Sequence, residues 1–169
     1  MHHETFMRLA LQEAHQALAG NEFPVGAVIV AGNEPVASAR RENSRNETAN
    51  ELDHAEIVAL RVLLGRRPDI NRQSLTVYST MEPCLMCYST MLLIGIRNFV
   101  YAYEDVMGGG TGLQLAHLAP LYRDMEPQIT ILPHILRQES LELFKAFFSS
   151  PENSYWQNSL LAEYTLTQP

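Results

Sequence analysis

Two short motifs, far apart in the chain, constrain its fold and chemistry more than any other feature. The first is His54-Ala55-Glu56, and the second runs from Pro83 to Cys87 with cysteines at positions 84 and 87. One imidazole and two thiolates are three good zinc ligands, and three protein ligands leave a fourth tetrahedral position open, as in catalytic sites. The motifs therefore predict one catalytic Zn²⁺ per chain, held by His54, Cys84 and Cys87.

The residues around each motif place these ligands at the starts of two predicted helices. Cys84 and Cys87 are spaced i and i+3, so a helix that begins at Pro83 puts both thiolates on one face of its first turn. The partial positive charge of a helix N-terminus favours thiolate there. An apolar period over residues 54–65 predicts the second helix, with His54 in its first turn.

Glu56 is left outside the ligand set and is suited to move protons between a zinc-bound water and a substrate. A C-x-x-C pair by itself is as often a redox pair or half of a zinc knuckle. The His-x-Glu partner and the proline before the cysteines favour a catalytic zinc site over both. A noncatalytic zinc-containing subunit or RNA-binding module is a further alternative, and such a protein would have no need of Glu56.

Strand and helix patterns alternate along the chain and predict an α/β fold. Strands are predicted over residues 25–30, 36–39, 74–80, 99–103 and 129–131, and helices over 4–19, 54–65, 84–95 and 138–148. The glycine early in the first strand predicts a close approach to its backbone, and the apolar helix 84–95 should be buried on several sides. We expect one domain over residues 1–150 and a tail, 151–169, that packs on it or on a partner subunit.

Charge and cysteine usage bear on partners and compartment. The chain has 12 basic and 19 acidic residues and a formal net charge of −7, the wrong sign for gripping nucleic acid through many phosphates. Both cysteines are used by the predicted site, which suits a reducing cytoplasm. No run of about twenty apolar residues is present that could span a membrane.

Two stretches are candidates to border a substrate pocket. Asn43 lies in a polar loop between residues 40 and 53, where its amide could read the edge or sugar of a nucleoside. It could equally be a turn residue, and the sequence leaves both open. The glycine-rich stretch 108–112 follows a predicted strand and is therefore also expected to border a pocket.

These motifs together resemble the tRNA adenosine deaminase branch of the cytidine deaminase superfamily, with guanine deaminases as near relatives. The paired H-x-E and P-C-x-x-C motifs are the signature of zinc deaminases. Over residues 5–148 the resemblance includes Pro24-Val25-Gly26-Ala27, Asn43, His54-Ala55-Glu56, Glu82-Pro83-Cys84-Leu85-Met86-Cys87, Asp105 with Gly109 and Gly112, and Phe147-Phe148.

The resemblance implies a three-layer α/β/α sandwich with a central five-stranded mixed sheet, and usually a homodimer. It implies that Glu56 is the catalytic proton carrier and that Val25 lines the base pocket. It further implies that Asn43 binds the base or ribose, that Asp105 lies near the ribose, and that Phe148 belongs to a closing C-terminal helix.

The chain departs from this branch in two places. Residues 149–153 stand where the tRNA enzymes have a basic run, and Asn50-Glu51-Leu52-Asp53 replaces the usual D-P-T-A. Asp53 either faces the pocket mouth, where it would favour a guanine-like base with extra N–H donors, or caps the helix.

We therefore expect a cytoplasmic zinc hydrolase that deaminates a small nucleobase or nucleoside, preferably a purine. The wobble adenosine of a tRNA anticodon loop is the alternative substrate.

Overall fold

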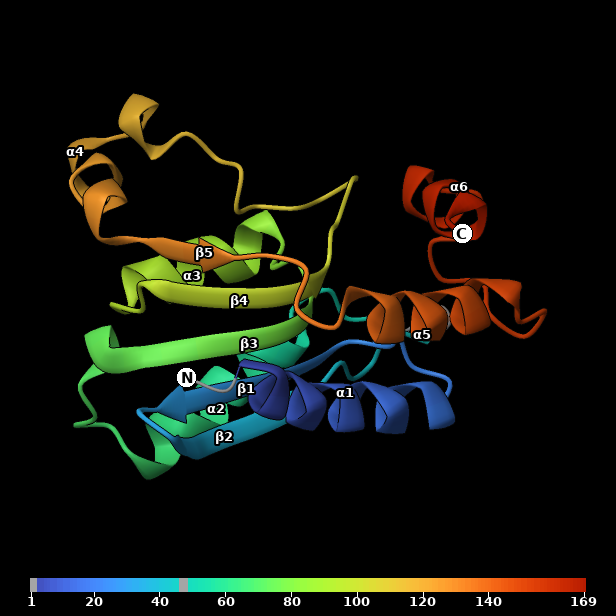
Figure 1. Cartoon of the computed structure of the whole chain (residues 1–169), viewed down its shortest axis with the longest axis horizontal. Helices are drawn as coiled ribbons and strands as arrows, with labels where there is room; N and C mark the ends of the chain where they lie inside the picture. Colours follow the sequence, from blue (N-terminus) through green and yellow to red (C-terminus); the bar gives the residue numbers. More distant parts are fainter. Residues whose placement is uncertain (1–2, 46–48) are drawn as a thin grey trace.

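One mixed β-sheet organises the chain, of which the computed structural model describes residues 3–45 and 49–169 (Figure 1). The strands are β1 (Gly26–Ala31), β2 (Glu34–Arg40), β3 (Leu75–Met81), β4 (Asn98–Tyr103) and β5 (Thr130–Leu132), in the spatial order β2-β1-β3-β4-β5. Strand β1 is antiparallel to β2 and β3, whereas β3, β4 and β5 are parallel. This confirms the predicted five-stranded mixed sheet.

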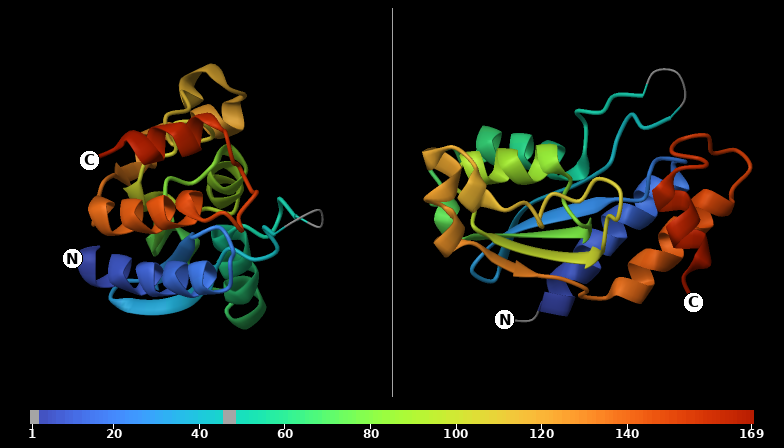
Figure 2. Two further views of the ribbon diagram at one scale, coloured as in Figure 1. Left: turned by 90° about the vertical axis from the view of Figure 1, so that its right-hand side faces the viewer. Right: turned by 90° about the horizontal axis from the view of Figure 1, so that it is seen from above.

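Helices cover both faces of the sheet, as predicted (Figure 2). Helices α1 (His3–Ala19) and α5 (Arg137–Ser149) lie on one face, and α2 (Ala55–Arg66) and α3 (Leu85–Leu93) lie on the other. Side chains of a strand alternate between the two faces. Val28 and Val30 accordingly pack in one core cluster with α1, while Ala27 and Ile29 pack in the cluster that contains α2 and α3.

Gly26 lets helix α1 lie directly against β1. A Cβ atom at this position would lie 2.1 Å from the carbonyl oxygen of Ala10 and 2.6 Å from the backbone nitrogen of Ala14. Backbone atoms in the middle of a helix cannot move aside for a methyl group. The predicted close approach is therefore confirmed, and the element that approaches is α1.

Helix α3 differs from its prediction in two respects. Cys84 is the N-cap with extended backbone, so the helix begins at Leu85 and not at Pro83. Leu85 is 54% exposed and Leu93 is 57% exposed. The expected burial on several sides is therefore wrong at Leu85 and Leu93. Helix α3 lies flat on the sheet and buries the side that carries Cys87 and Met91.

Residues 151–169 fold back over α5 and contain a further helix, α6 (Leu160–Thr167), that was not predicted. The segment between β4 and β5 contains α4 (Pro120–Arg123) and the short 3-10 helices η3 (Leu115–His117) and η4 (Glu126–Gln128); η2 (Arg72–Ser74) precedes β3. In the described residues, every helix is too short or too polar to cross a membrane.

Candidate functional site

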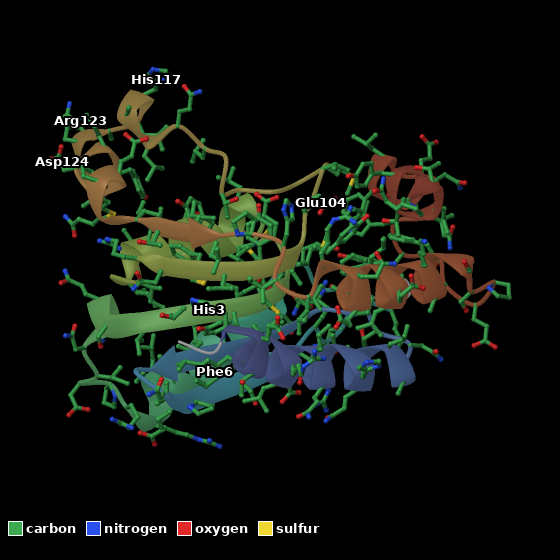
Figure 3. All side chains as sticks on the ribbon, viewed as in Figure 1. His3, Phe6, Glu104, His117, Arg123 and Asp124 are labelled. Carbon is green, nitrogen blue, oxygen red and sulfur yellow. The ribbon has the colours of Figure 1, made fainter. Side chains whose placement is uncertain are left out.

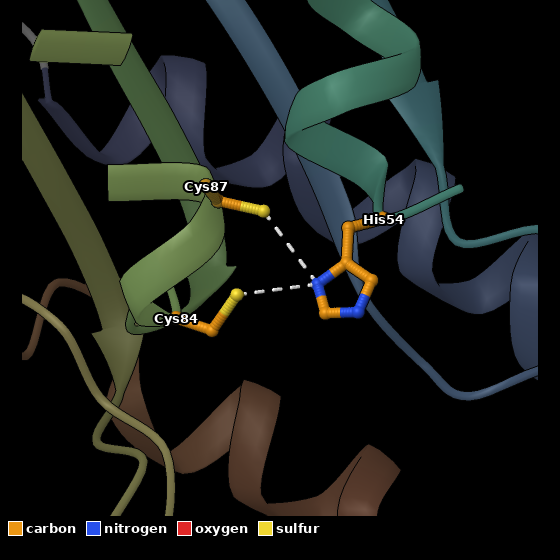
Figure 4. Close-up of side chains that lie close together, drawn as sticks. All are labelled: His54, Cys84 and Cys87. Carbon is orange, nitrogen blue, oxygen red and sulfur yellow. Dashed lines mark hydrogen bonds between the residues drawn. The ribbon is translucent and has the colours of Figure 1, made fainter. Parts of the chain in front are cut away.

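The side chains of His54, Cys84 and Cys87 converge between the first turns of α2 and α3 (Figure 4). The Nδ1 atom of His54 lies 3.5 Å from the Sγ atom of Cys84 and 3.5 Å from that of Cys87. All three ligand atoms lie within 4.8 Å of one another, and in the described part of the chain this group contains no carboxylate. The structure thus brings the three predicted ligands together.

The spacing of these atoms fits a tetrahedral zinc ion. Zinc bonds of about 2.05 Å to nitrogen and about 2.3 Å to sulfur, at the tetrahedral angle, separate nitrogen from sulfur by about 3.6 Å. Both observed separations of 3.5 Å match this value, and three protein ligands would leave one tetrahedral position open.

The two thiols differ in acidity. A hydrogen bond from Cys87 lowers the pKa of Cys84 to about 4, although burial acts in the opposite direction. The same bond, in which Cys87 keeps its proton, raises the pKa of Cys87 together with burial. Because zinc binds thiolate, zinc uptake releases any proton that remains on the two sulfur atoms.

Glu56 lies beside the ligand group without joining it. Its side chain is only 3% exposed, and its Oε1 atom accepts a hydrogen bond of 3.0 Å from the hydroxyl of Ser79 on β3. Burial and then the negative charge at Cys84 raise the pKa of Glu56 above its usual range. A buried carboxyl group with a raised pKa is well suited to accept and release protons.

A cavity of about 360 Å³ opens over this centre, and His54, Glu56 and Cys84 line it. Its walls are mainly apolar, and they carry the further carboxylates of Glu51, Glu82 and Asp105. An apolar cavity of this size with a few polar groups is typical of a small-ligand site.

Two of the five predicted substrate-binding residues line the cavity. Val25 is buried immediately before the start of β1 and is part of the lining, as is Asp105. The Oδ1 atom of Asp105 accepts hydrogen bonds from the backbone nitrogens of Met107 and Gly108, at 3.0 and 2.9 Å. Burial raises the pKa of Asp105, and these backbone bonds oppose the increase.

Asn43 and Asp53 bind each other and lie outside the described lining of the cavity. The Nδ2 atom of Asn43 donates to Oδ2 of Asp53 at 2.8 Å, and Asn50 donates to the same oxygen at 2.7 Å. Arg61 reaches Oδ1 of Asp53 at 2.8 Å. His54 is the N-cap of α2, so Asp53 does not cap this helix, and it is also not part of the described cavity lining. Its carboxylate instead connects the loop before α2 to Arg61. Asn43 has a left-handed φ of 54°, as in turns.

Phe148 lies in the core behind the cavity and not in its described lining. Its ring packs edge-on against Phe147 and against Phe23, and Phe23 is a lining residue. Phe148 therefore supports the cavity wall from behind, through its contact with Phe23.

The C-terminal segment supplies a wall that was not predicted from the sequence. Tyr155, Trp156 and Leu161 all line the cavity. Arg41 and Glu51 were also missed as lining residues, although both lie in the polar loop that leads to His54. The adjacent aromatic pair at 155 and 156 was the available signal, but no local pattern connects that pair to a site built by α2 and α3.

Glu82 holds the glycine-rich loop at the edge of the cavity. Its Oε2 atom accepts from the backbone nitrogen of Asp105 at 3.2 Å, and its Oε1 atom accepts from that of Thr111 at 3.2 Å. A Cβ atom on Gly109 would lie 2.5 Å from Oε2 of Glu82, and one on Gly110 would lie 2.8 Å from the backbone of Leu85. The prediction that this loop borders a pocket is confirmed, since Gly108 lines the cavity.

Comparisons with known proteins agree with this geometry. The family model described as the cytidine and deoxycytidylate deaminase zinc-binding region matches residues 1–103. The tRNA-specific adenosine deaminase 2 of Xenopus laevis is 30% identical over 151 residues, which cover 86% of this chain and 85% of that protein.

Two solved structures share the fold. One comes from studies of A-to-I editing by tRNA:A34 deaminases at the wobble position; it has a TM-score of 0.66 and 26% identity, and the match covers 82% of this chain and 98% of that one. The other, a guanine deaminase from Nitrosomonas europaea, has a TM-score of 0.66 over 85% of this chain and 83% of that one. At 18% identity the second likeness concerns the fold alone.

Proposed function

This chain belongs to the cytidine and deoxycytidylate deaminase family and is a zinc-dependent hydrolytic deaminase; on that premise, we propose that it deaminates adenosine in a tRNA. The position of Glu56 carries the mechanistic part of this proposal, because it is a buried carboxyl group at the cavity that stands outside the ligand group. The choice of substrate is supported by the relative from Xenopus laevis, which matches most of both chains.

The residues of the site divide the reaction between them. His54, Cys84 and Cys87 would hold zinc, which lowers the pKa of a bound water toward neutrality and so supplies a nucleophile. Glu56 would accept one proton from the attacking water and deliver it to the ring nitrogen beside C6 of the adenine ring. Glu56 would then take the second proton, from the hydroxyl group formed on C6, and pass it to the departing amine, so that ammonia leaves and a carbonyl remains.

The lining residues would orient the base. We assign Val25 to apolar contact with the ring, because it is buried at the cavity wall. Asp105, which the glycine-rich loop holds at the edge, is assigned to the ribose. Asn43 is not assigned to the substrate, because it donates to Asp53 and lies outside the described lining.

A free purine base or nucleoside is the second candidate substrate. It is favoured by the wall that Tyr155, Trp156 and Leu161 form, since this wall narrows the cavity. The cavity also carries the carboxylates of Glu51, Glu56, Glu82 and Asp105, and the chain has a net charge of −7, both of which repel phosphate.

Product analysis on a substrate panel separates the two candidates. An anticodon stem-loop with adenosine at the wobble position would be compared with adenine, adenosine, guanine, guanosine and cytidine, and ammonia and the modified base would be measured. Inosine formed in the stem-loop, with no reaction of the free purines, supports the tRNA proposal; the opposite pattern replaces it by the second candidate. Glu56→Gln protein at equal concentration corrects for contaminating deaminases.

Compartment and assembly complete the proposal. We propose a cytoplasmic location, because the two cysteines are free thiols suited to metal binding. We also propose that two copies associate, as the family resemblance implies. Sedimentation analysis at micromolar concentration would test this association.

A further inference from the structure

One carboxylate oxygen connects the zinc-binding histidine to the C-terminal segment. The Oε2 atom of Glu51 lies 3.6 Å from Nε2 of His54, 2.8 Å from the hydroxyl oxygen of Tyr155 and 3.6 Å from Nη2 of Arg41. All four residues line the cavity. Three separate parts of the chain therefore meet at one oxygen atom.

The orientation of the His54 ring determines what Glu51 can do. Nδ1 faces both cysteine sulfurs and Nε2 faces Glu51, so zinc bound at Nδ1 would leave the ring proton on Nε2. Histidines that bind a metal commonly present their second nitrogen to a carboxylate, which fixes the tautomer and the ring orientation. At 3.6 Å, with the Glu51 side chain 56% exposed, this contact is electrostatic and modest in strength.

Arg41 keeps Glu51 and Tyr155 in this arrangement. Its side chain is 2% exposed, and its Nη1 atom donates to the backbone oxygens of Glu42 and Asn50 at 2.7 and 2.8 Å. These bonds fix the guanidinium in place, 5.8 Å from the centre of the Tyr155 ring. A fixed cation beside Oε2 orients the carboxylate of Glu51 between His54 and Tyr155.

Glu51 lies three positions before His54, in the loop that leads to α2. We propose that Glu51 is a positioning residue that orients His54 through Nε2 and holds Tyr155 at the cavity wall. The Glu51 side chain would then couple two properties: how tightly the site retains zinc, and how rigidly Tyr155, Trp156 and Leu161 are held at the cavity wall. This rests on the proposed function only in requiring zinc at His54, Cys84 and Cys87.

Two measurements on the full-length zinc-loaded protein test the coupling, and neither needs a substrate. The first is the rate at which zinc passes to a chromogenic chelator, and the second is amide hydrogen exchange in residues 155–162. Glu51→Ala should release zinc about tenfold faster, at the low end of the range for outer partners of metal ligands. Exchange in the segment should also become faster.

Three further variants make the test specific. Glu51→Gln keeps an oxygen that can accept from Tyr155 but loses the charge beside Nε2, so exchange in residues 155–162 should stay near the wild-type rate while zinc release becomes faster. Tyr155→Phe removes the hydroxyl that donates to Glu51 and accepts from Arg41 at 3.5 Å, and it should accelerate exchange in the C-terminal segment by itself. In combination with Glu51→Ala it should add little. Glu34→Ala removes an equal charge from an exposed position on β2 and should change neither measurement.

The proposal is overturned if Glu51→Ala releases zinc at the wild-type rate, or if exchange in residues 155–162 does not change. It is also overturned if Tyr155→Phe and Glu51→Ala have fully additive effects on exchange. A chain that binds zinc but deaminates no member of the substrate panel would contradict the proposed function and leave these measurements interpretable.

Discussion

The hydroxyl of Ser79 donates a hydrogen bond of 3.0 Å to Oε1 of Glu56 and so connects the middle of β3 to the first turn of α2. Both side chains are buried. The bond sets the orientation of the carboxylate before a substrate arrives. Such pre-organisation lets a proton-transfer group act without rearranging during the reaction.

Replacing Glu56 by Gln should abolish turnover without loss of zinc. The amide oxygen of Gln can still accept from Ser79, but it cannot carry a proton, so kcat should fall by about 10²–10⁴-fold or more. Steady-state kinetics and elemental analysis of the same sample test this. Ser79→Ala, which leaves the carboxylate in place, should have a much smaller effect. Loss of zinc from the Gln variant would instead make Glu56 a ligand.

Removing zinc should destabilise the folded chain, because the metal joins the starts of α2 and α3. A ligand that binds only the folded state raises stability with its concentration. The thermal midpoint of the wild-type protein should therefore fall when a chelator is added, and elemental analysis should give one zinc per chain beforehand. Cys87→Ala should contain no zinc and show no chelator-dependent shift. An equal shift in both proteins would place the metal elsewhere.

Glu104 should stabilise the C-terminal helices in a pH-dependent manner. It accepts hydrogen bonds from Arg137 and Tyr164, and lies at the end of β4 (Figure 3). Burial alone would raise the pKa of Glu104, but these bonds outweigh burial and lower it from 4.5 to about 2. A carboxyl group with a lowered folded-state pKa stabilises the protein above pH 4.5, and this contribution is lost as the pH falls toward 2.

Glu104→Gln should therefore lower the free energy of unfolding at pH 7 by about 1–2 kcal/mol. The loss of stability between pH 4.5 and 2 should be smaller in this variant than in the wild type. Urea unfolding across this pH range measures both effects. Glu34→Gln, at an exposed position, should behave like the wild type; an identical pH profile for Glu104→Gln would show that the ion pair contributes nothing.

Gly26→Ala should destabilise the protein because the added methyl group would meet the backbone of α1. Overpacking of this kind costs about 1–3 kcal/mol, and helix α1 would have to move away from β1. Gly65→Ala is the matched control, since a Cβ there meets nothing within 4 Å and lies in α2. It should be neutral or raise stability by about 0.5 kcal/mol. Similar midpoints in urea for the two variants would contradict the close approach.

Much of the site could be predicted from the sequence because zinc demands particular residue types at short, regular spacings. Cys84 and Cys87 belong to one motif, and Glu56 lies two positions from His54. Such neighbours are placed together by local backbone geometry alone. The elements of the sheet were predictable for the same reason, since alternation and helical periods are local patterns.

The sequence by itself therefore predicted the layered fold, the three side chains that meet at the candidate zinc site and the carboxyl group beside them. Only the tertiary structure decided which residues form the walls of the cavity. Helix α6 has little amphipathic pattern of its own, and Leu161 is buried only because the segment folds back on the domain. Likewise Asp53 is held by Asn43 and Arg61, and Tyr155 meets Glu51 from the far end of the chain. Such contacts depend on where whole elements pack, and no short-range spacing encodes that packing.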